Sequence, residues 1–445
     1  MKDFTPEVQE LIKTRNWSAL RSMTSRWPVA EVADLVLELP KTERVLLFRA
    51  LSRTLAAEVF AYFEAIDQDA LLGELTGEET RHLMANLRPD DRTALLEELP
   101  AEVTQRLLAF LSPNDLLEAR ELLGYPEESV GRLMTPDYVS IRPEWDAAKA
   151  MEHIRKAGRE RETVDVLYVT DPASRLLGVV SLRQLVLGNP QDSVRGIMRS
   201  PAVSASAFMD REEASKIMER YDISVLPVID SGGLLVGIVT GDDVLEVVQE
   251  EATEDFHKSA AVAPFGVGLL DAKFSLLYKS RVGWLLGLVL VYLLSGAIVA
   301  SFEAAISEIV ALVFFLPLIT DCAGNAGAQS ATLMVRALAM GDVEPKDWTK
   351  VLLREIGVAL ALSLTMSAAV WAVGTLKLGM GIAVVASLSM LIVVTTSCIL
   401  GVAIPSIMDR VGLDSAAASS PLVTSIADIL GVLIYFSVAA RYLHL

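Results

Sequence analysis

The sequence contains little cysteine or histidine. Its 445 residues include 2 Cys and 4 His, and the two cysteines, Cys322 and Cys398, lie far apart in the chain. So few thiol and imidazole groups exclude a disulfide framework and a Cys-rich zinc module. A metal site in this chain would have to be built from oxygen ligands, which suit Mg2+ or Ca2+ better than zinc or copper.

Positive charge is also scarce. The chain has 39 Lys and Arg against 57 Asp and Glu, and its formal net charge is -18. Residues 272–445 carry ten side chains of each sign, so the whole acidic excess lies in the first 271 residues. A surface this acidic argues against nucleic-acid binding and makes cations the natural ligands. The sequence has no Gly-Lys-Ser/Thr phosphate loop, and we do not expect an enzyme.

Five apolar runs are long enough to cross a bilayer. Three are uncharged, and two are interrupted by polar residues, one at Asp321 and Asn325 and the other at Asp428. The runs are 282–302, 309–335, 356–376, 378–408 and 415–440. The first 27 residues are polar and charged, which does not fit a secretory signal. Flanking Lys and Arg lie mainly on the side of the N-terminus. We therefore expect a five-span α-helical membrane domain over 273–445, with a cytosolic N-terminus and an external C-terminus.

Residues 1–130 predict an all-α domain. Leu and Ala recur at spacings of three and four, and prolines interrupt the pattern at Pro40, Pro89, Pro100 and Pro113. Each predicted helix is too short to bury its apolar face alone, so the helices should stack as a small solenoid. Two roles remain open for this domain: a plain interaction scaffold, or a sensor.

Residues 131–243 contain an imperfect internal repeat, with copies at about 131–193 and 194–243. The segment 131–136 recurs as 196–201, and 177–181 recurs as 236–240. Each copy runs through a helix into a short apolar strand, which predicts two α/β modules.

The repeat resembles a tandem pair of CBS modules. The resemblance implies that Gly237, Thr240 and Asp243 bind ATP or another adenine nucleotide. The first copy has Gln184 where the corresponding acid would be, so one nucleotide site is expected rather than two. A purely structural pair that binds no nucleotide is the alternative.

The segment 244–272 connects these modules to the membrane domain, and a helix from about Asp242 to Lys258 is its most charged part. Four acidic residues fall within about 80° on one helix face, and two more lie beside them. They are Asp243, Glu246, Glu250 and Glu254, with Glu251 and Asp255 alongside. Like charges at these spacings oppose helix formation unless a cation neutralises them. A solvated acidic linker is the simpler interpretation, but the position of the segment favours divalent-cation binding.

Two polar groups lie inside predicted membrane spans. Ionisable groups there are costly and mark ion pathways unless they are buried against partners. Asp428 has apolar neighbours on both sides, and Asn325 lies in the Gly- and Ala-rich segment 321–329. Either residue could serve helix packing alone. Together they indicate a cation path lined by carbonyl and carboxylate oxygens.

The order of these parts resembles the bacterial MgtE magnesium channels over essentially the whole chain. Four segments carry the resemblance, namely 125–135, 251–255, 324–332 and 421–428. It implies a homodimer in the bacterial inner membrane with a central pore that imports Mg2+, and Mn2+ or Co2+ are further candidate ions. It also implies that cytosolic Mg2+ closes the pore by binding between the soluble domains and the connecting helix.

The same resemblance assigns roles to individual residues. Asp428 would be the pore aspartate, with Thr424 one turn away and Asn325 near the pore. The implied metal ligands are all carboxylates, namely Asp428 in the pore and Asp90, Asp91, Asp210, Glu212, Asp222, Asp243, Glu246, Glu251, Glu254 and Asp255 in the cytosolic part. The chain departs from many relatives at Ala323 and Ser420, which bears on ion selectivity without removing the pore aspartate.

Two other functions remain open. A CBS-regulated carrier could exchange a divalent cation for Na+ or H+, and its flux would depend on a counter-ion gradient. A membrane-anchored sensor would conduct nothing, but it would have no reason to keep Asp428 inside its last span.

Overall fold

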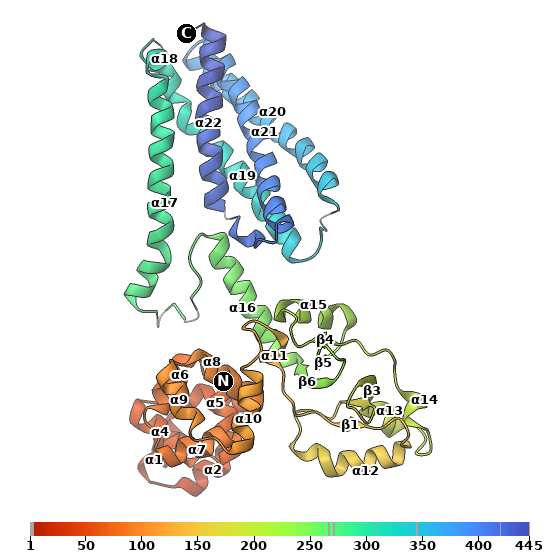
Figure 1. Cartoon of the computed structure of the whole chain (residues 1–445). Coiled ribbons are helices and arrows are strands. Elements are labelled where there is room, and N and C mark those ends of the chain that lie inside the picture. The colour runs from red at the N-terminus through yellow and green to blue at the C-terminus, as the bar shows by residue number, and fades with distance from the viewer. Residues whose placement is uncertain are drawn as a thin grey trace. The chain divides into compact units, whose positions relative to one another are not determined.

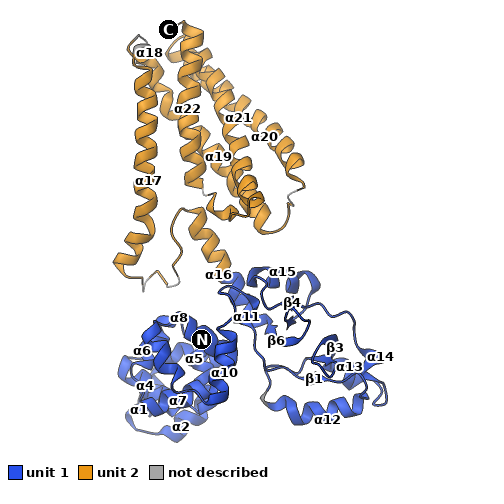
Figure 2. Ribbon diagram, viewed as in Figure 1, with its two compact units in different colours: residues 1–249 blue, residues 250–445 orange. Residues whose placement is uncertain are grey.

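The computed structural model describes residues 4–265, 268–269, 272–308, 310–343, 346–418 and 420–444. The chain forms two compact units, Met1–Gln249 and Glu250–Leu445 (Figure 2). Helix α16 (Gly241–Ser259) runs across the boundary between them (Figure 1). Each unit has its own hydrophobic core and is described separately below.

The first part of unit 1 is an array of short helices, as predicted. Several begin at a proline, because proline lacks the N–H that a first-turn residue leaves unused. Pro89 and Pro113 occupy the first turn of their helices. The helices share one core that includes Phe60 and Met84. They are α1 (Thr5–Lys13), α2 (Trp17–Thr24), α3 (Val29–Glu38), α4 (Lys41–Ala50), α5 (Arg53–Ala61), α6 (Ala65–Leu72), α7 (Gly77–Asn86), α8 (Pro89–Glu98), α9 (Ala101–Leu108) and α10 (Pro113–Leu122).

The rest of unit 1 consists of two similar α/β modules, which confirms the predicted repeat. Each holds a three-stranded sheet in which the first two strands are parallel and the last two antiparallel. The first module contains β1 (Ser140–Ile141), α12 (Ala147–Ala157), η1 (Gly158–Glu160), β2 (Val166–Thr170), β3 (Leu176–Ser181) and α13 (Leu182–Leu187). The second contains β4 (Ala205–Ser206), α15 (Arg211–Tyr221), β5 (Val225–Ile229) and β6 (Leu235–Thr240), and short helices α11 (Val130–Leu133) and α14 (Val194–Ile197) precede the two modules.

The two modules exchange the segments that precede their first strands. Thr135 pairs with Ile238 of the second module, and Arg199 pairs with Val179 of the first. A glycine lies beneath each crossing segment. A Cβ atom built on Gly237 would lie 2.7 Å from Met134 Sδ, and one built on Gly178 would lie 2.6 Å from the carbonyl oxygen of Arg199. The repeated glycines therefore allow close backbone approach.

Helices are the only regular elements among the described residues of unit 2, and five of them are long and apolar enough to cross a membrane, as predicted. The last of them begins at Ser420 rather than at Ser415, because 415–417 form a separate turn that the Asp414 side chain caps. Ile309, the predicted start of the second span, lies outside the described residues. The elements are α17 (Phe274–Ser301), α18 (Glu303–Glu308), η2 (Val310–Phe314), α19 (Leu316–Ala339), α20 (Trp348–Lys377), α21 (Met380–Arg410), η3 (Ser415–Ala417) and α22 (Ser420–Leu443).

Small residues allow α19 to pack tightly against α21. A Cβ atom built on Gly401 would lie 2.3 Å from the carbonyl oxygen of Gly327. Ser397 Oγ donates to the carbonyl oxygen of Ala323 at 2.5 Å. Close helix contact through Gly, Ala and Ser is typical of membrane helices, because it maximises van der Waals contact where no hydrophobic effect acts between helices. By contrast, Ser280 is the one residue of α17 that is buried.

Candidate cation sites

Helices α19 and α22 run antiparallel, and hydroxyl groups contact across them. The hydroxyl oxygens of Thr332 and Ser420 lie 3.2 Å apart. Thr424 Oγ1 donates to the carbonyl oxygen of Gly324 at 3.4 Å. These two contacts fix the register, since residue numbers fall along α19 as they rise along α22.

Asp428 lies one turn after Thr424 on α22, so the two side chains share a helix face. A Cβ atom built on Gly324 would lie 3.5 Å from Asp428 Oδ1 and 2.7 Å from Thr424 Cγ2. The absence of a side chain at Gly324 therefore lets both residues approach α19. The structure brings Asp428 and Thr424 together against this glycine.

Asn325 follows Gly324 on α19. Its Nδ2 donates to the main-chain carbonyl oxygen of Asp321 at 2.9 Å. Because this bond stays within α19, the side-chain oxygen of Asn325 is the group left to face an ion or its water. Asn325 and Asp428 thus lie on neighbouring helices beside the same glycine, with no hydrogen bond between them among the described contacts.

Asp321 interrupts the second apolar run of the sequence, but it was not among the predicted pore residues. It lies four residues before Asn325, which places both on one face of α19. Its charge interacts with that of Asp428. The spacing to Asn325 was the available signal, but only the packing of α22 on α19 identifies Asp428 as the neighbour.

In unit 1, carboxylates gather where α8 begins. Asp90 and Asp91 lie in the first turn of α8, and Asp242 and Asp243 lie in the first turn of α16. A helix dipole favours acidic side chains at these positions, so local sequence accounts for their presence. The tertiary fold adds a second feature, since the charge of Asp243 acts on Asp90 and that of Asp242 acts on Asp91.

Glu162 of the first module joins this group, although the sequence gave it no role. Its side chain is 7% exposed and forms an ion pair with Arg88, which immediately precedes α8. Its charge also interacts with those of Asp243 and Asp242. Because 74 residues separate Arg88 from Glu162, no local pattern could have predicted the pair. The acidic cluster is defined here as Asp90, Asp91, Glu162, Asp242 and Asp243.

Burial and mutual repulsion favour protonation of the acidic cluster. Burial, followed by the charges of Asp243 and Asp91, raises the pKa of Asp90 well above its ordinary value. Burial raises the pKa of Glu162 to about 7, although Arg88 opposes the change. Burial also raises the pKa of Asp243 to about 6, although the hydrogen bonds from Thr240 act to lower it. Asp90 is 8% exposed, and its Oδ1 has no hydrogen-bond donor among the described residues. A cation would satisfy this oxygen.

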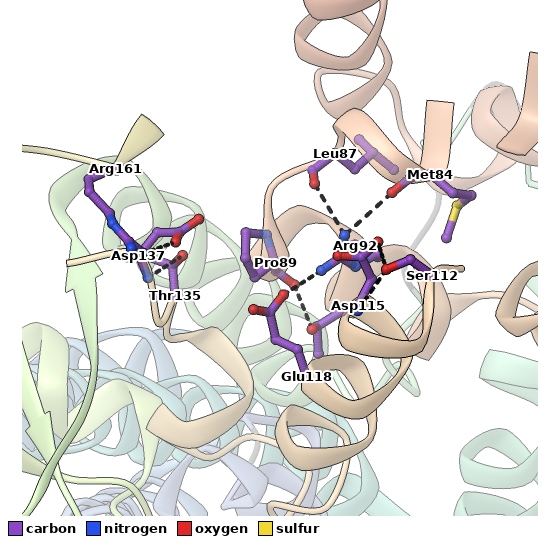
Figure 3. A network of polar contacts seen from close by, with 11 residues as sticks. Met84, Leu87, Pro89, Arg92, Ser112, Asp115, Glu118, Thr135, Asp137 and Arg161 are labelled. Atoms are coloured by element: carbon purple, nitrogen blue, oxygen red, sulfur yellow. Dashed lines mark hydrogen bonds and ion pairs between the residues drawn. The ribbon is translucent and has the colours of Figure 1, made fainter. Parts of the chain in front are cut away.

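A buried arginine fixes the start of α8 (Figure 3). Arg92 is 3% exposed. Its Nη1 donates to the carbonyl oxygens of Met84 and Leu87 at 3.4 and 3.5 Å, and its Nη2 donates to Glu118 Oε1 at 2.5 Å. These bonds tie α8 to the end of α7 and to α10. Asp90 and Asp91 are consequently held on a rigid element.

Three other predicted ligands occupy the ends of α15. Asp210 Oδ1 accepts a hydrogen bond from the Glu212 amide at 2.8 Å, and Glu212 pairs with Lys216 at 2.7 Å. Asp222 caps the other end of α15 with a left-handed backbone, φ 51°. Asp210 and Asp222 are therefore separated by roughly 18 Å along the helix axis. The structure does not bring these two aspartates into one site.

The connecting helix α16 has a lysine among its carboxylates. Lys258 Nζ lies 2.7 Å from Glu254 Oε1 and 2.6 Å from Asp414 Oδ2, just before η3. Burial lowers the pKa of Lys258, but its hydrogen bonds to Asp414 and Glu254 outweigh this and raise it.

The remaining predicted ligands on α16 lie outside any closed metal site. They are Glu246, Glu251 and Asp255. Over the described ranges, no three His, Cys, Asp or Glu side chains are grouped closely enough to hold a metal ion. A cation in either unit would therefore meet these carboxylates singly, in pairs or through water.

Two of the three candidate nucleotide residues, Thr240 and Asp243, contact each other. Thr240 Oγ1 donates to Asp243 Oδ2 at 2.5 Å, at the start of α16. In the first module, Gln184 takes the equivalent position and forms a capping box with Ser181. Gln184 thus preserves the helix cap while removing the charge. Gly237 lies away from this pair, beneath Met134.

Family models match three parts of the chain. A divalent cation transporter model matches residues 316–438, an MgtE intracellular N domain model matches 27–128, and a CBS domain model matches 130–187 and 194–250. The order of these matches follows the order of the helical array, the two modules and the membrane helices.

Curated relatives resemble the chain over most of its length. A magnesium transporter MgtE from Thermus thermophilus is 39% identical over 332 residues, which cover 74% of this chain and 73% of the relative. A magnesium transporter MgtE from Bacillus subtilis is 35% identical, with 73% and 71% covered.

Solved structures resemble the cytosolic part. The cytosolic domain of the Mg2+ channel MgtE in complex with ATP has a TM-score of 0.52 and 34% identity, and the match covers 55% of this chain and 99% of that one. The soluble part of a magnesium transporter has a TM-score of 0.54 and 27% identity, with 57% and 99% covered.

Proposed function

The chain belongs to the MgtE family of magnesium transporters, and from this premise we propose that it is a Mg2+-selective channel. Mg2+ enters the cell down its electrochemical gradient, since the membrane potential drives a divalent cation inward without ATP hydrolysis. The Asp428 and Thr424 face of α22, packed against Gly324, is the observation that carries the proposal.

Asp428 acts on the ion in its hydrated form. Mg2+ sheds water reluctantly and usually keeps several waters in protein sites. A carboxylate, a threonine hydroxyl and the nearby Asn325 amide offer few fixed oxygens, which suits contact with a water shell better than a dehydrating cage. The loose spacing of carboxylates in the described residues agrees with this form of contact.

Cytosolic Mg2+ closes the channel by neutralising carboxylates. In the acidic cluster, Oδ1 of Asp90 has no donor among the described residues, and several acidic groups repel one another. Mg2+ bound there holds the helical array on the paired modules. Further carboxylates along α16 respond in the same way, and the helix then obstructs the pore. At low Mg2+ the repulsion returns and the pore opens.

An adenine nucleotide modulates this response from the second module. The solved cytosolic domain of a relative was in complex with ATP. In this chain the candidate residues are Gly237, Thr240 and Asp243. Because Asp243 also belongs to the acidic cluster, nucleotide and Mg2+ would be linked through one side chain.

The assembly is a homodimer in the bacterial inner membrane. Its N-terminal domains lie in the cytosol, and its C-terminus lies outside. Helix α17 supports a further protein or lipid contact, because Ile298 and Val299 near its end pack on the core of unit 2, whereas apolar side chains along its middle, such as Leu286 and Leu290, are exposed.

Mg2+ flux into proteoliposomes under a fixed membrane potential tests the proposal. Asp428→Ala should abolish flux, because it removes the carboxylate that attracts the ion. The double change Glu254→Ala and Asp255→Ala should preserve flux but weaken its inhibition by Mg2+ on the cytosolic side.

Other outcomes would favour other functions. Undiminished flux in the Asp428→Ala protein would refute the pore assignment. Flux that requires an opposing Na+ or H+ gradient would identify a carrier. If well-folded wild-type protein shows no flux, the remaining function is that of a membrane-anchored sensor that conducts no ions.

A further inference from the structure

Asp321 lies level with Asp428 across the contact between α19 and α22. The antiparallel register places Gly324 beside Thr424 and Asp428. Closer to the start of α19, Thr320 lies next to Gly431 of α22. A Cβ atom built on Gly431 would lie 3.8 Å from Thr320 Cγ2. Asp321 follows Thr320 directly. It therefore lies between the two points where α19 and α22 touch.

The two aspartates form a like-charged pair inside the membrane unit. The charge of Asp321 acts on Asp428. Asp321 itself is exposed on α19. In the described part of unit 2, neither carboxylate has a hydrogen-bond donor or a basic partner. Ionised groups at membrane depth are rare and are normally paired or solvated by water in a pathway. A cation, with or without its water shell, would offset the repulsion between two such groups.

We propose that Asp321 is a second ion-contacting carboxylate of the pore and that it raises selectivity for divalent over monovalent cations. This inference rests on the proposed channel function. Asp321 and Asp428 come from different helices of one protomer, so each protomer supplies two carboxylates to the path. A denser negative charge favours a divalent ion more than a monovalent one, because the attraction scales with the charge of the ion.

The other carboxylate near this helix provides a matched control. Glu355 on α20 accepts a hydrogen bond from Ser330 Oγ at 2.5 Å. It is therefore an acidic group of the same unit that already has a partner on α19. Glu355→Gln removes one charge from unit 2 without touching the aspartate pair.

The test compares Asp321→Asn, Asp321→Glu, Asp428→Asn and Glu355→Gln in proteoliposomes made from the full chain. Initial Mg2+ flux and the reversal potential under opposed Mg2+ and Na+ gradients are both measured. Asp321→Asn should raise the Mg2+ concentration for half-maximal flux roughly tenfold and shift the reversal potential toward that of Na+. Asp321→Glu should keep both the Mg2+ concentration for half-maximal flux and the reversal potential close to those of the wild type. Glu355→Gln should match the wild type in both quantities.

The outcomes separate this inference from the proposed function. If Asp428→Asn abolishes flux while Asp321→Asn leaves flux and reversal potential unchanged, the role of Asp321 is refuted and the channel stands. If Asp428→Asn is also without effect, the pore assignment itself fails. Equal losses in Asp321→Asn and Glu355→Gln would show a general charge effect and would also overturn the inference. A thermal unfolding curve of each variant distinguishes loss of function from loss of fold.

Discussion

At the scale of single residues, the spacing between α19 and α22 is set by one missing side chain. Gly324 has no Cβ, and one placed there would lie 2.7 Å from Thr424 Cγ2. The helix backbone at this position is ordinary, so the requirement is for space rather than for an unusual φ. The position of Asp428 depends on this space, because Asp428 lies on the same face of α22.

Gly324→Ala should therefore damage both stability and conduction. The added methyl group must displace Thr424 or separate the helices, which we expect to cost roughly 1–3 kcal/mol. A lower midpoint of thermal unfolding in detergent and a lower Mg2+ flux are the expected results. Gly283→Ala on α17 is the control, since nothing lies within 4 Å of its Cβ position. An unchanged midpoint for Gly324→Ala would show that α22 is free to move.

At the scale of elements, the first turns of α8 and α16 both carry carboxylates. These carboxylates repel one another and so oppose the packing of the two helix ends. Asp90, Asp243 and Glu162 all have raised pKa values, with burial as the first cause. Each group binds its proton more tightly in the packed arrangement than when the elements separate. The packed state therefore binds more protons than the separated state, and the free energy that favours packing must decrease as the pH rises.

In the presence of a metal chelator, α8 should be better protected from hydrogen exchange at pH 5.5 than at pH 8. The loss should occur between the ordinary carboxyl range and about pH 7, since the pKa of Asp243 is about 6 and that of Glu162 about 7. Rates are corrected for the intrinsic effect of pH. Saturating Mg2+ should restore protection at pH 8. Glu162→Gln should reduce the pH dependence, and equal protection at both pH values would contradict the argument.

At the scale of the whole molecule, acid is concentrated outside the membrane unit, and single basic groups are placed where they neutralise it. Arg88 neutralises Glu162 in unit 1. Lys258 lies between Glu254 and Asp414 in unit 2. If Mg2+ binds the cytosolic carboxylates as proposed, these fixed cations make some of the contacts that it would otherwise have to make.

Lys258→Gln should shift the Mg2+ concentration for half-closure upward by about threefold. The lysine ties the end of α16 to the segment before η3, and partly exposed ion pairs of this kind contribute about 0.2–1 kcal/mol each. Flux inhibition by cytosolic Mg2+ in proteoliposomes measures the shift. Lys350→Gln serves as the control, because Lys350 is largely exposed and pairs within its own turn with Asp347. A downward shift for Lys258→Gln would mean that Lys258 competes with Mg2+ instead.

The sequence predicted the parts of this protein that depend on local pattern. Apolar periodicity identified the short helices and the five membrane helices, and recurring segments identified the repeat. The cost of charge in a bilayer led to the prediction that Asp428 contacts the ion. The sequence marked Asp321 as a polar interruption of a span, but it could not identify Asp428 as its neighbour, nor Asp243 as a neighbour of Glu162. Their partners lie on distant elements, and only packing brings them together. The separation of Asp210 and Asp222 did follow from the sequence, because each copy of the repeat was predicted to contain a helix and these two residues flank α15.

The exchange of segments between the two modules has consequences for their folding and for their origin. Thr135 adds a bridge to the edge of the sheet in the second module, and Arg199 adds one to that of the first. Each half lacks one of its contacts without the other, so the pair should unfold in one cooperative step. Because the exchanged contacts are reciprocal, a single ancestral copy would have satisfied them by pairing with a second identical chain.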